Sequence, residues 1–169
     1  LRASDLYYEG DIELPRLKNY FLNIGQAKVA TSAYEAFDLG YLQKGKDNIT
    51  VNSHKLIEDA KQKVLLLDNL GYTKPLKRKD IKILGKEAMG MFLVGADSFR
   101  EGKYITQHEQ LMCKKLAYVL CGGNLSSPTT VSEKYLLDLE REAFLSLCGE
   151  AKTLDRIKHM LEKGKPLRN

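Results

Sequence analysis

The sequence predicts an all-α or nearly all-α fold of about seven helices, arranged in two small lobes. Apolar residues recur at three- and four-residue spacing along most of the 169 residues, which is the pattern of amphipathic helices. Glycines and prolines interrupt this pattern repeatedly and so divide it into separate helices. Only two short runs, Ile49–Val51 and Ile81–Ile83, are typical of extended chain, so little sheet is expected. A content of 43% hydrophobic and 29% charged residues favours a folded domain over a disordered one.

The first two predicted helices lie before residue 41, and the second is short. The first begins near residues 11–15, where a proline suits an early helical position, and fades near Val29. In the second, Ser32 and Glu35 have the spacing of a capping box, in which each side chain accepts a hydrogen bond from a backbone N–H. Gly40 is expected to end it in the left-handed conformation. The apolar stripe of the first helix comprises Leu14, Leu17, Phe21 and Ile24.

The third predicted helix runs from about residue 52 to Leu70. The segment that follows, Tyr72–Asp80, contains a proline and four basic residues, and we expect it to be an exposed connection. It predicts a boundary between two domains, residues 1–72 and residues 73–169. The stripe that the third helix is expected to pack against its neighbours consists of Leu56, Ile57, Ala60, Val64 and Leu67.

Four further helices are predicted in residues 73–169. The fourth helix ends near Glu101, and the fifth begins at a second capping box, Thr106 with Glu109, and ends at the pair Gly122-Gly123. The fourth is expected to bury Met89, Phe92, Leu93, Ala96 and Phe99, and the fifth carries Leu111, Met112, Leu116, Val119 and Leu120.

The sixth predicted helix spans roughly Val131–Cys148, after a loop that Pro128 holds extended. The seventh begins at Thr153 and ends at Gly164, and the five residues beyond it are expected to be loose unless they dock. The apolar faces of these two helices comprise Leu136, Leu139, Ala143, Phe144 and Leu147, and Leu154, Ile157, Met160 and Leu161.

The cysteine content of the chain indicates a cellular compartment, whereas its net charge does not identify a binding partner. The net charge of +5 is compatible with nucleic acid, anionic lipid or phosphate-bearing ligands, and it selects none of them. Three cysteines without CxxC spacing argue against a disulfide framework and against a zinc site, so a reducing compartment, the cytoplasm, is expected. No apolar run approaches the ~20 residues of a spanning helix. The first residue, Leu1, is not a methionine, which we interpret as a hint of a fragment.

Histidine, cysteine and carboxylate side chains are the candidates for catalysis or metal binding. His54, His108 and His159 fall on three different predicted helices without the spacing of a metal motif, so structural roles are predicted for them. The cysteines, Cys113, Cys121 and Cys148, lie in apolar helical registers and are predicted to pack as small hydrophobic residues. The acidic pairs Glu58-Asp59 and Glu140 with Glu142 are predicted to lie on solvated faces, with Arg141, Lys134 and Lys152 available as partners for the second pair.

Two other features could bind phosphate but are better explained otherwise. Gly122-Gly123 follows a helix rather than a strand and lacks GxGxxG, so helix termination explains it. The basic run Lys74–Lys79 could contact a phosphate or nucleic acid, yet nucleic-acid motifs and interleaved aromatic residues are missing, and a solvated linker is predicted. The sequence therefore predicts no catalytic, cofactor-binding or metal-binding residue in these 169 residues.

Several segments resemble known enzymes. Residues 30–42, ATSAYEAFDLGYL, followed by the helix at Leu56–Lys61, resemble the late part of the crotonase (enoyl-CoA hydratase/isomerase) fold, although Ala30 stands where many crotonases have glycine. REGKYIT at 100–106, KLAYVLCGG at 115–123, EREAFLSLCGE at 140–150 and the closing GKPLRN resemble the end of long bacterial 3-hydroxyacyl-CoA dehydrogenases that carry a crotonase-like module. The resemblance extends from about Leu14 onward.

The resemblance implies that a parent protein of fatty-acid β-oxidation oxidises 3-hydroxyacyl-CoA with NAD. The family's dinucleotide fold, its catalytic histidine and glutamate, and its oxyanion-hole loops match no position here, so no catalytic residue is carried over. The implied fold is the helical C-terminal part of a crotonase fold plus an extension. Its implied partners are the remainder of the parent chain, a second copy in a homo-oligomer, and acyl-CoA through the parent, with no nucleic acid.

Two functional hypotheses follow. The first is a C-terminal helical region of such an enzyme, with a structural or assembly role. The second is a free-standing helical interaction module that binds an acidic or nucleic-acid partner. It would bind through two basic clusters, the run Lys74–Lys79 and the C-terminal Lys163, Lys165 and Arg168. Salt-sensitive binding would be the sign of it.

Overall fold

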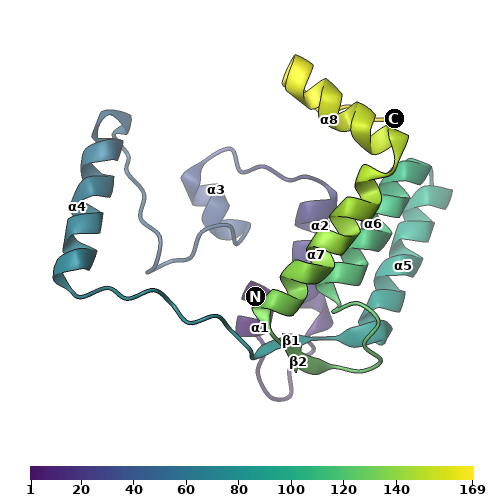
Figure 1. Cartoon of the computed structure of the whole chain (residues 1–169), viewed down its shortest axis with the longest axis horizontal. Helices are drawn as coiled ribbons and strands as arrows, with labels where there is room; N and C mark the ends of the chain where they lie inside the picture. Colours follow the sequence, from purple (N-terminus) through teal and green to yellow (C-terminus); the bar gives the residue numbers. More distant parts are fainter. The chain divides into compact units, whose positions relative to one another are not determined.

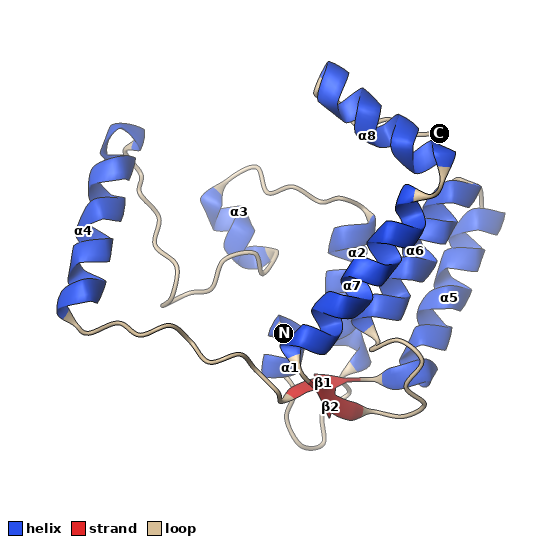
Figure 2. Ribbon diagram, viewed as in Figure 1, coloured by secondary structure: helices blue, strands red, loops and turns tan.

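A computed structural model describes all residues, 1–169, as a nearly all-α protein. Eight α-helices and one 3₁₀ helix accompany a sheet of only two strands, the red elements of Figure 2. The predicted fold class is therefore confirmed. The helix that the sequence did not predict is α1 (Arg2–Asp5), a single turn.

The chain divides into two compact units, each described here by itself. The first, the bundle unit, combines Leu1–Ala27 with Lys77–Asn169, and the second, the insert unit, is Lys28–Leu76. The second junction lies four residues beyond the predicted boundary at 72/73. Residues 1–27 differ from the prediction, because their apolar side chains join the core of the C-terminal helices. The division into a crotonase-like segment and an extension stays a prediction.

The insert unit contains α3 (Ala33–Asp38), the 3₁₀ helix η1 (Ser53–Lys55) and α4 (Leu56–Asn69). The Ser32 hydroxyl accepts a hydrogen bond from the backbone N–H of Glu35, as predicted. The Glu35 carboxylate accepts from the N–H and hydroxyl of Thr31, one residue earlier than a capping box requires.

Two predictions in the insert unit are wrong. Ile49–Val51 forms no strand, because no other segment pairs with it. The apolar stripe of α4 is exposed rather than packed: none of its residues is buried, and Ile57 is 80% exposed. The insert unit has too few elements of its own to cover that stripe.

In the bundle unit, α5 (Gly85–Glu101), α6 (Gln107–Leu120) and α7 (Glu133–Cys148) lie side by side, and α2 (Leu14–Gly25) packs on α6 (Figure 1). The capping box of Thr106 and Glu109 at the start of α6 is present as predicted. The rings of Phe21 and Phe92 stack with their centroids 4.5 Å apart and join α2 to α5. The buried core around them also contains Ala3, Leu17, Leu84, Ala88, Ala117 and Cys121.

The sheet closes one end of the bundle, opposite the end that carries α8 (Figure 1). Its strands β1 (Ile81–Ile83) and β2 (Thr129–Val131) pair antiparallel, with Ile81 opposite Val131. The extended segment at Ile81–Ile83 was predicted, whereas Val131 was expected to be helical. Backbone pairing holds Val131 in the strand, and α7 begins only after Ser132, whose hydroxyl caps the N–H of Tyr135.

The last helix, α8 (Ala151–Lys163), begins two residues earlier than predicted and ends at Gly164, which is left-handed with φ +64°. The tail beyond it docks back on the bundle through Arg168 and Asn169. One burial prediction for α5 is wrong: Phe99 is 44% exposed, and its ring forms a T-shaped pair with that of Tyr104, with the centroids 6.0 Å apart. None of the helices combines the length and apolar character that crossing a bilayer requires.

Candidate functional site

The three histidines have different environments. His54 is exposed in η1, and His159 is half-buried on α8. His108, on α6, is the one buried polar residue, and its Nε2 lies 3.0 Å from the Thr153 hydroxyl of α8. Desolvation, followed by the charge of Arg156, lowers the pKa of His108. No three histidine, cysteine or acidic side chains gather in a way that could hold a metal ion.

The cysteine thiols sit in apolar surroundings. Cys121 is fully buried at the end of α6, and its burial raises the pKa of the thiol to about 12. Burial also raises the pKa of Cys113. Both thiols are therefore protonated and poorly nucleophilic at neutral pH, in line with the predicted packing role. All three cysteines are free.

The acidic pairs do not form a dyad. Glu140 and Glu142 are exposed on α7, and two of the three basic residues expected beside them pair with Asp138 instead. Lys134 Nζ lies 2.5 Å from a carboxylate oxygen of Asp138, and Arg141 lies 3.4 Å from its other oxygen. In the insert unit, Asp59 accepts a hydrogen bond from the Thr50 hydroxyl.

The glycine pair and one residue of the basic run, Arg78, make contacts within the fold. Gly122 and Gly123 both have positive φ and turn the chain at the end of α6, and the carbonyl of Gly122 accepts a hydrogen bond from the Tyr135 hydroxyl. Arg78, from the basic run, is held by the carboxylates of Asp5 and Asp80.

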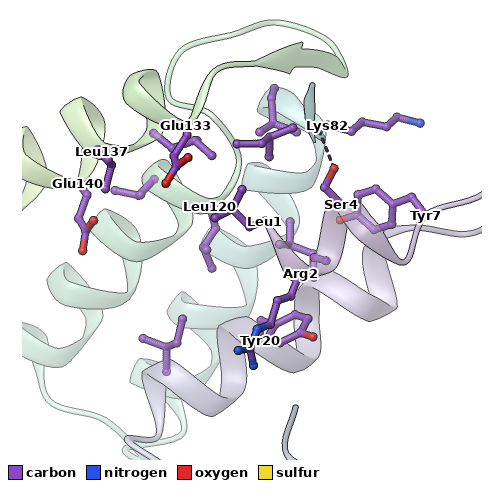
Figure 3. A pocket seen from close by; sticks show the side chains of 17 residues that line it. Leu1, Arg2, Ser4, Tyr7, Tyr20, Lys82, Leu120, Glu133, Leu137 and Glu140 are labelled. Carbon is purple, nitrogen blue, oxygen red and sulfur yellow. Dashed lines mark hydrogen bonds between the residues drawn. The ribbon is translucent and has the colours of Figure 1, made fainter. Parts of the chain in front are cut away.

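An apolar pocket of about 380 Å³ lies within the bundle unit (Figure 3). The side chains of Leu17 and Tyr20 on α2 and Leu120 on α6 form part of its wall, and Leu137 of α7 faces them. Lys82 lies at its edge beside Ser4, whose hydroxyl accepts a hydrogen bond from the Lys82 backbone N–H. The lining is mostly apolar, and its charged members are Arg2, Lys82, Glu133 and Glu140.

A polar network of the bundle unit joins α6, α8 and the tail, and the sequence predicted only the capping role of its Glu109. We call Glu109, Arg156, Arg168 and Asn169 the C-terminal latch. The Glu109 carboxylate accepts a hydrogen bond from the Thr106 N–H at 2.8 Å and from Arg168 at 3.1 Å, and it pairs with Arg156 at 3.5 Å. Desolvation opposes its ionisation, but these donors and charges together lower the pKa of Glu109.

Further hydrogen bonds complete the latch. Arg168 donates to the carbonyl of Tyr104, and Arg156 Nε donates to the side-chain oxygen of Asn169 at 2.8 Å. The Asn169 amide donates to the carbonyl of Lys152 at 3.2 Å. The two tail residues are thus tied to α6, to α8 and to the turn between α5 and α6. Local spacing along the chain gave no signal for these contacts. The partners of Arg168, for example, lie 59 and 64 residues away from it.

The latch region should lose stability in mild acid. The folded-state pKa of His108 lies below its ordinary value of 6.5, so the unfolded chain takes up a proton first as the pH falls through that value. The stability that depends on neutral His108 is therefore complete above pH 6.5 and declines below it. Glu150 and Glu109 favour the protonated form, whereas Arg156 and Lys152 oppose it. Glu109 adds a loss at still lower pH, as its own depressed pKa is passed.

Urea unfolding between pH 7 and pH 5 measures this effect. The unfolding free energy of the bundle unit should fall over that range, and His108→Gln should flatten the fall. His54→Gln, at an exposed position, is the matched control and should leave the slope unchanged. An equal slope in the His108→Gln variant would contradict the assignment.

The chain is similar to part of a larger protein. Over 149 residues it is 47% identical to a probable 3-hydroxyacyl-CoA dehydrogenase of Bacillus subtilis (strain 168). The aligned part is 88% of this chain but 19% of that protein, so the chain spans about a fifth of its relative's length. No protein-family model matches the chain. No solved structure matches it either.

Proposed function

We propose that these residues form the C-terminal helical region of a 3-hydroxyacyl-CoA dehydrogenase of fatty-acid β-oxidation that also carries an enoyl-CoA hydratase-like module. Their role is structural: they pack against the rest of that longer chain, the parent protein. The observation that carries the proposal is the 47% identity, over 88% of the chain, to a protein named as a probable 3-hydroxyacyl-CoA dehydrogenase.

The parent protein would use NAD and an acyl-CoA substrate, and it would work in the cytoplasm as a homo-oligomer. Its reacting groups would lie outside these residues. Within them, the histidines sit apart on different elements, and the Cys113 and Cys121 thiols are held protonated by burial. The chemistry available here is that of packing and positioning.

The apolar stripe of α4 supports a packing role. A helix that exposes its apolar face gains little from the hydrophobic effect, since about 25 cal/mol is contributed by each Å² that leaves water. Ile57 and Val64, both in this stripe, are each more than 60% exposed. A protein surface that covers them would stabilise both partners, and the relative's further 81% could supply one.

Oxidation of a 3-hydroxyacyl-CoA, followed by NADH absorbance, tests the proposal. The purified 169-residue chain should show no turnover above a no-protein control, and the parent protein should turn the substrate over. Turnover by the 169-residue chain alone would contradict the structural role. A parent protein that binds neither NAD nor acyl-CoA would contradict the enzyme assignment.

The alternative, a module that binds an acidic or nucleic-acid partner, receives less support. Its basic run is partly engaged, because Arg78 is paired with Asp5 and Asp80. Salt-sensitive binding of RNA or DNA by the 169-residue chain would favour it over the leading proposal.

A further inference from the structure

The helix α8 leaves its apolar side chains exposed and is attached to the bundle by its polar residues. A surface helix ordinarily packs its apolar stripe inward and leaves its polar face in water. In α8 no residue is buried, and the apolar side chains remain accessible: Leu154 is 53% exposed and Leu161 is 82% exposed. Hydrophobic burial therefore contributes little to holding α8 in place.

Polar contacts hold it instead. Thr153 contacts the buried His108, and Arg156 pairs with Glu109 of α6. The tail then folds back, so that Arg168 reaches the same Glu109 and Asn169 reaches the carbonyl of Lys152. Charge-assisted hydrogen bonds of this kind fix orientation as well as adding stability.

The face left outward has the spacing of a recognition helix. Leu154, Ile157 and Leu161 stand at positions i, i+3 and i+7, which places them on one side of two helical turns. Amphipathic helices that insert into an apolar groove of another protein surface use anchors at this spacing.

We infer that the C-terminal latch holds α8 with Leu154, Ile157 and Leu161 outward, so that this stripe enters an apolar groove of the parent protein beyond these 169 residues. The inference rests on the proposed function, and it names the surface through which these residues would pack against the rest of the parent protein. The length of the similar protein indicates what covers the stripe. That protein has 81% of its sequence outside the aligned part, whereas nothing in this chain's own bundle covers the stripe.

Hydrogen exchange of the α8 amides, in the 169-residue chain and in the parent protein, tests the inference. In the 169-residue chain, Arg168→Ala should speed exchange by about tenfold, because losing a charge-assisted hydrogen bond costs on the order of one factor of ten. The double substitution Leu154→Glu with Leu161→Glu should leave exchange unchanged there. In the parent protein the double substitution should speed α8 exchange by about tenfold or more, because two leucine side chains that anchor the helix in the groove are lost.

The matched control is Ala151→Glu, which places one new carboxylate on the exposed start of the same helix. It should change exchange in neither protein. Equal α8 protection in the two proteins would overturn the inference, as would a Leu154→Glu/Leu161→Glu chain whose α8 opens without the parent. Protection that rises with the concentration of the 169-residue chain would overturn it in favour of a second copy.

The failure of this inference is separable from failure of the proposed function. A parent protein that oxidises 3-hydroxyacyl-CoA while its α8 exchanges as fast as in the isolated chain refutes the docking surface alone. Protected α8 in a parent protein without dehydrogenase activity refutes the enzyme assignment alone.

Discussion

Replacing Phe92 by alanine should lower the unfolding free energy of the bundle unit by about 3–5 kcal/mol, the usual cost of truncating a buried phenylalanine. Phe92 is 6% exposed and stacks on Phe21, so its ring joins α5 to α2 in the core. Truncation leaves a cavity that the small neighbours Ala88 and Ala117 cannot fill. The free energy is measured by urea denaturation followed by circular dichroism.

The matched control is Phe144→Ala on α7. Phe144 is 56% exposed, so the same truncation removes little buried surface, and a loss of less than about 1 kcal/mol is expected. Similar losses in the two variants would show that Phe92 does not hold the core together.

Gly85→Ala should destabilise the bundle unit by about 3 kcal/mol or more, because two costs add at this position. Gly85 has φ +70°, where a residue with a Cβ is strained. A Cβ there would also stand 2.8 Å from the backbone carbonyl carbon of Ser127 and 2.9 Å from its oxygen. Backbone cannot swing aside as a flexible side chain can, and the loop at Ser127 leads directly into β2.

Gly164→Ala separates the two costs. Gly164 has a similar φ of +64°, and a Cβ at this position would meet no atom within 4 Å. Only the conformational cost of about 1–2 kcal/mol applies. Thermal denaturation of both variants gives the comparison, and equal losses would mean that the loop at Ser127 moves freely.

Local signals in the sequence predicted the helix ends well. A cap depends on residues three apart and on the conformational preferences of glycine, and both are visible in the chain itself. Ser32 and Thr106 cap their helices, and Gly164 ends α8, where the sequence places them. The sequence likewise predicted which helix carries each histidine and cysteine, but not which side chains would surround it.

Contacts between distant residues were not predictable in this way. The pairing of Ile81 with Val131 converts the expected start of a helix into a strand, and it joins residues 50 positions apart. Arg156 and Arg168 both reach Glu109 from more than 40 residues away. Nothing in their local spacing marks them as partners, since any of the many arginines and lysines could have paired with that carboxylate.

The sequence by itself determined that this protein is helical and where most of its helices begin and end, because backbone hydrogen bonding and capping are local. Only the tertiary structure decided which apolar stripes are covered. The same periodicity buries Phe92 in α5 and leaves Ile57 of α4 and Leu161 of α8 in water. An apolar stripe in the sequence indicates that a helix has an apolar face. Burial of that face requires a second surface, and the sequence pattern of one helix does not contain that surface.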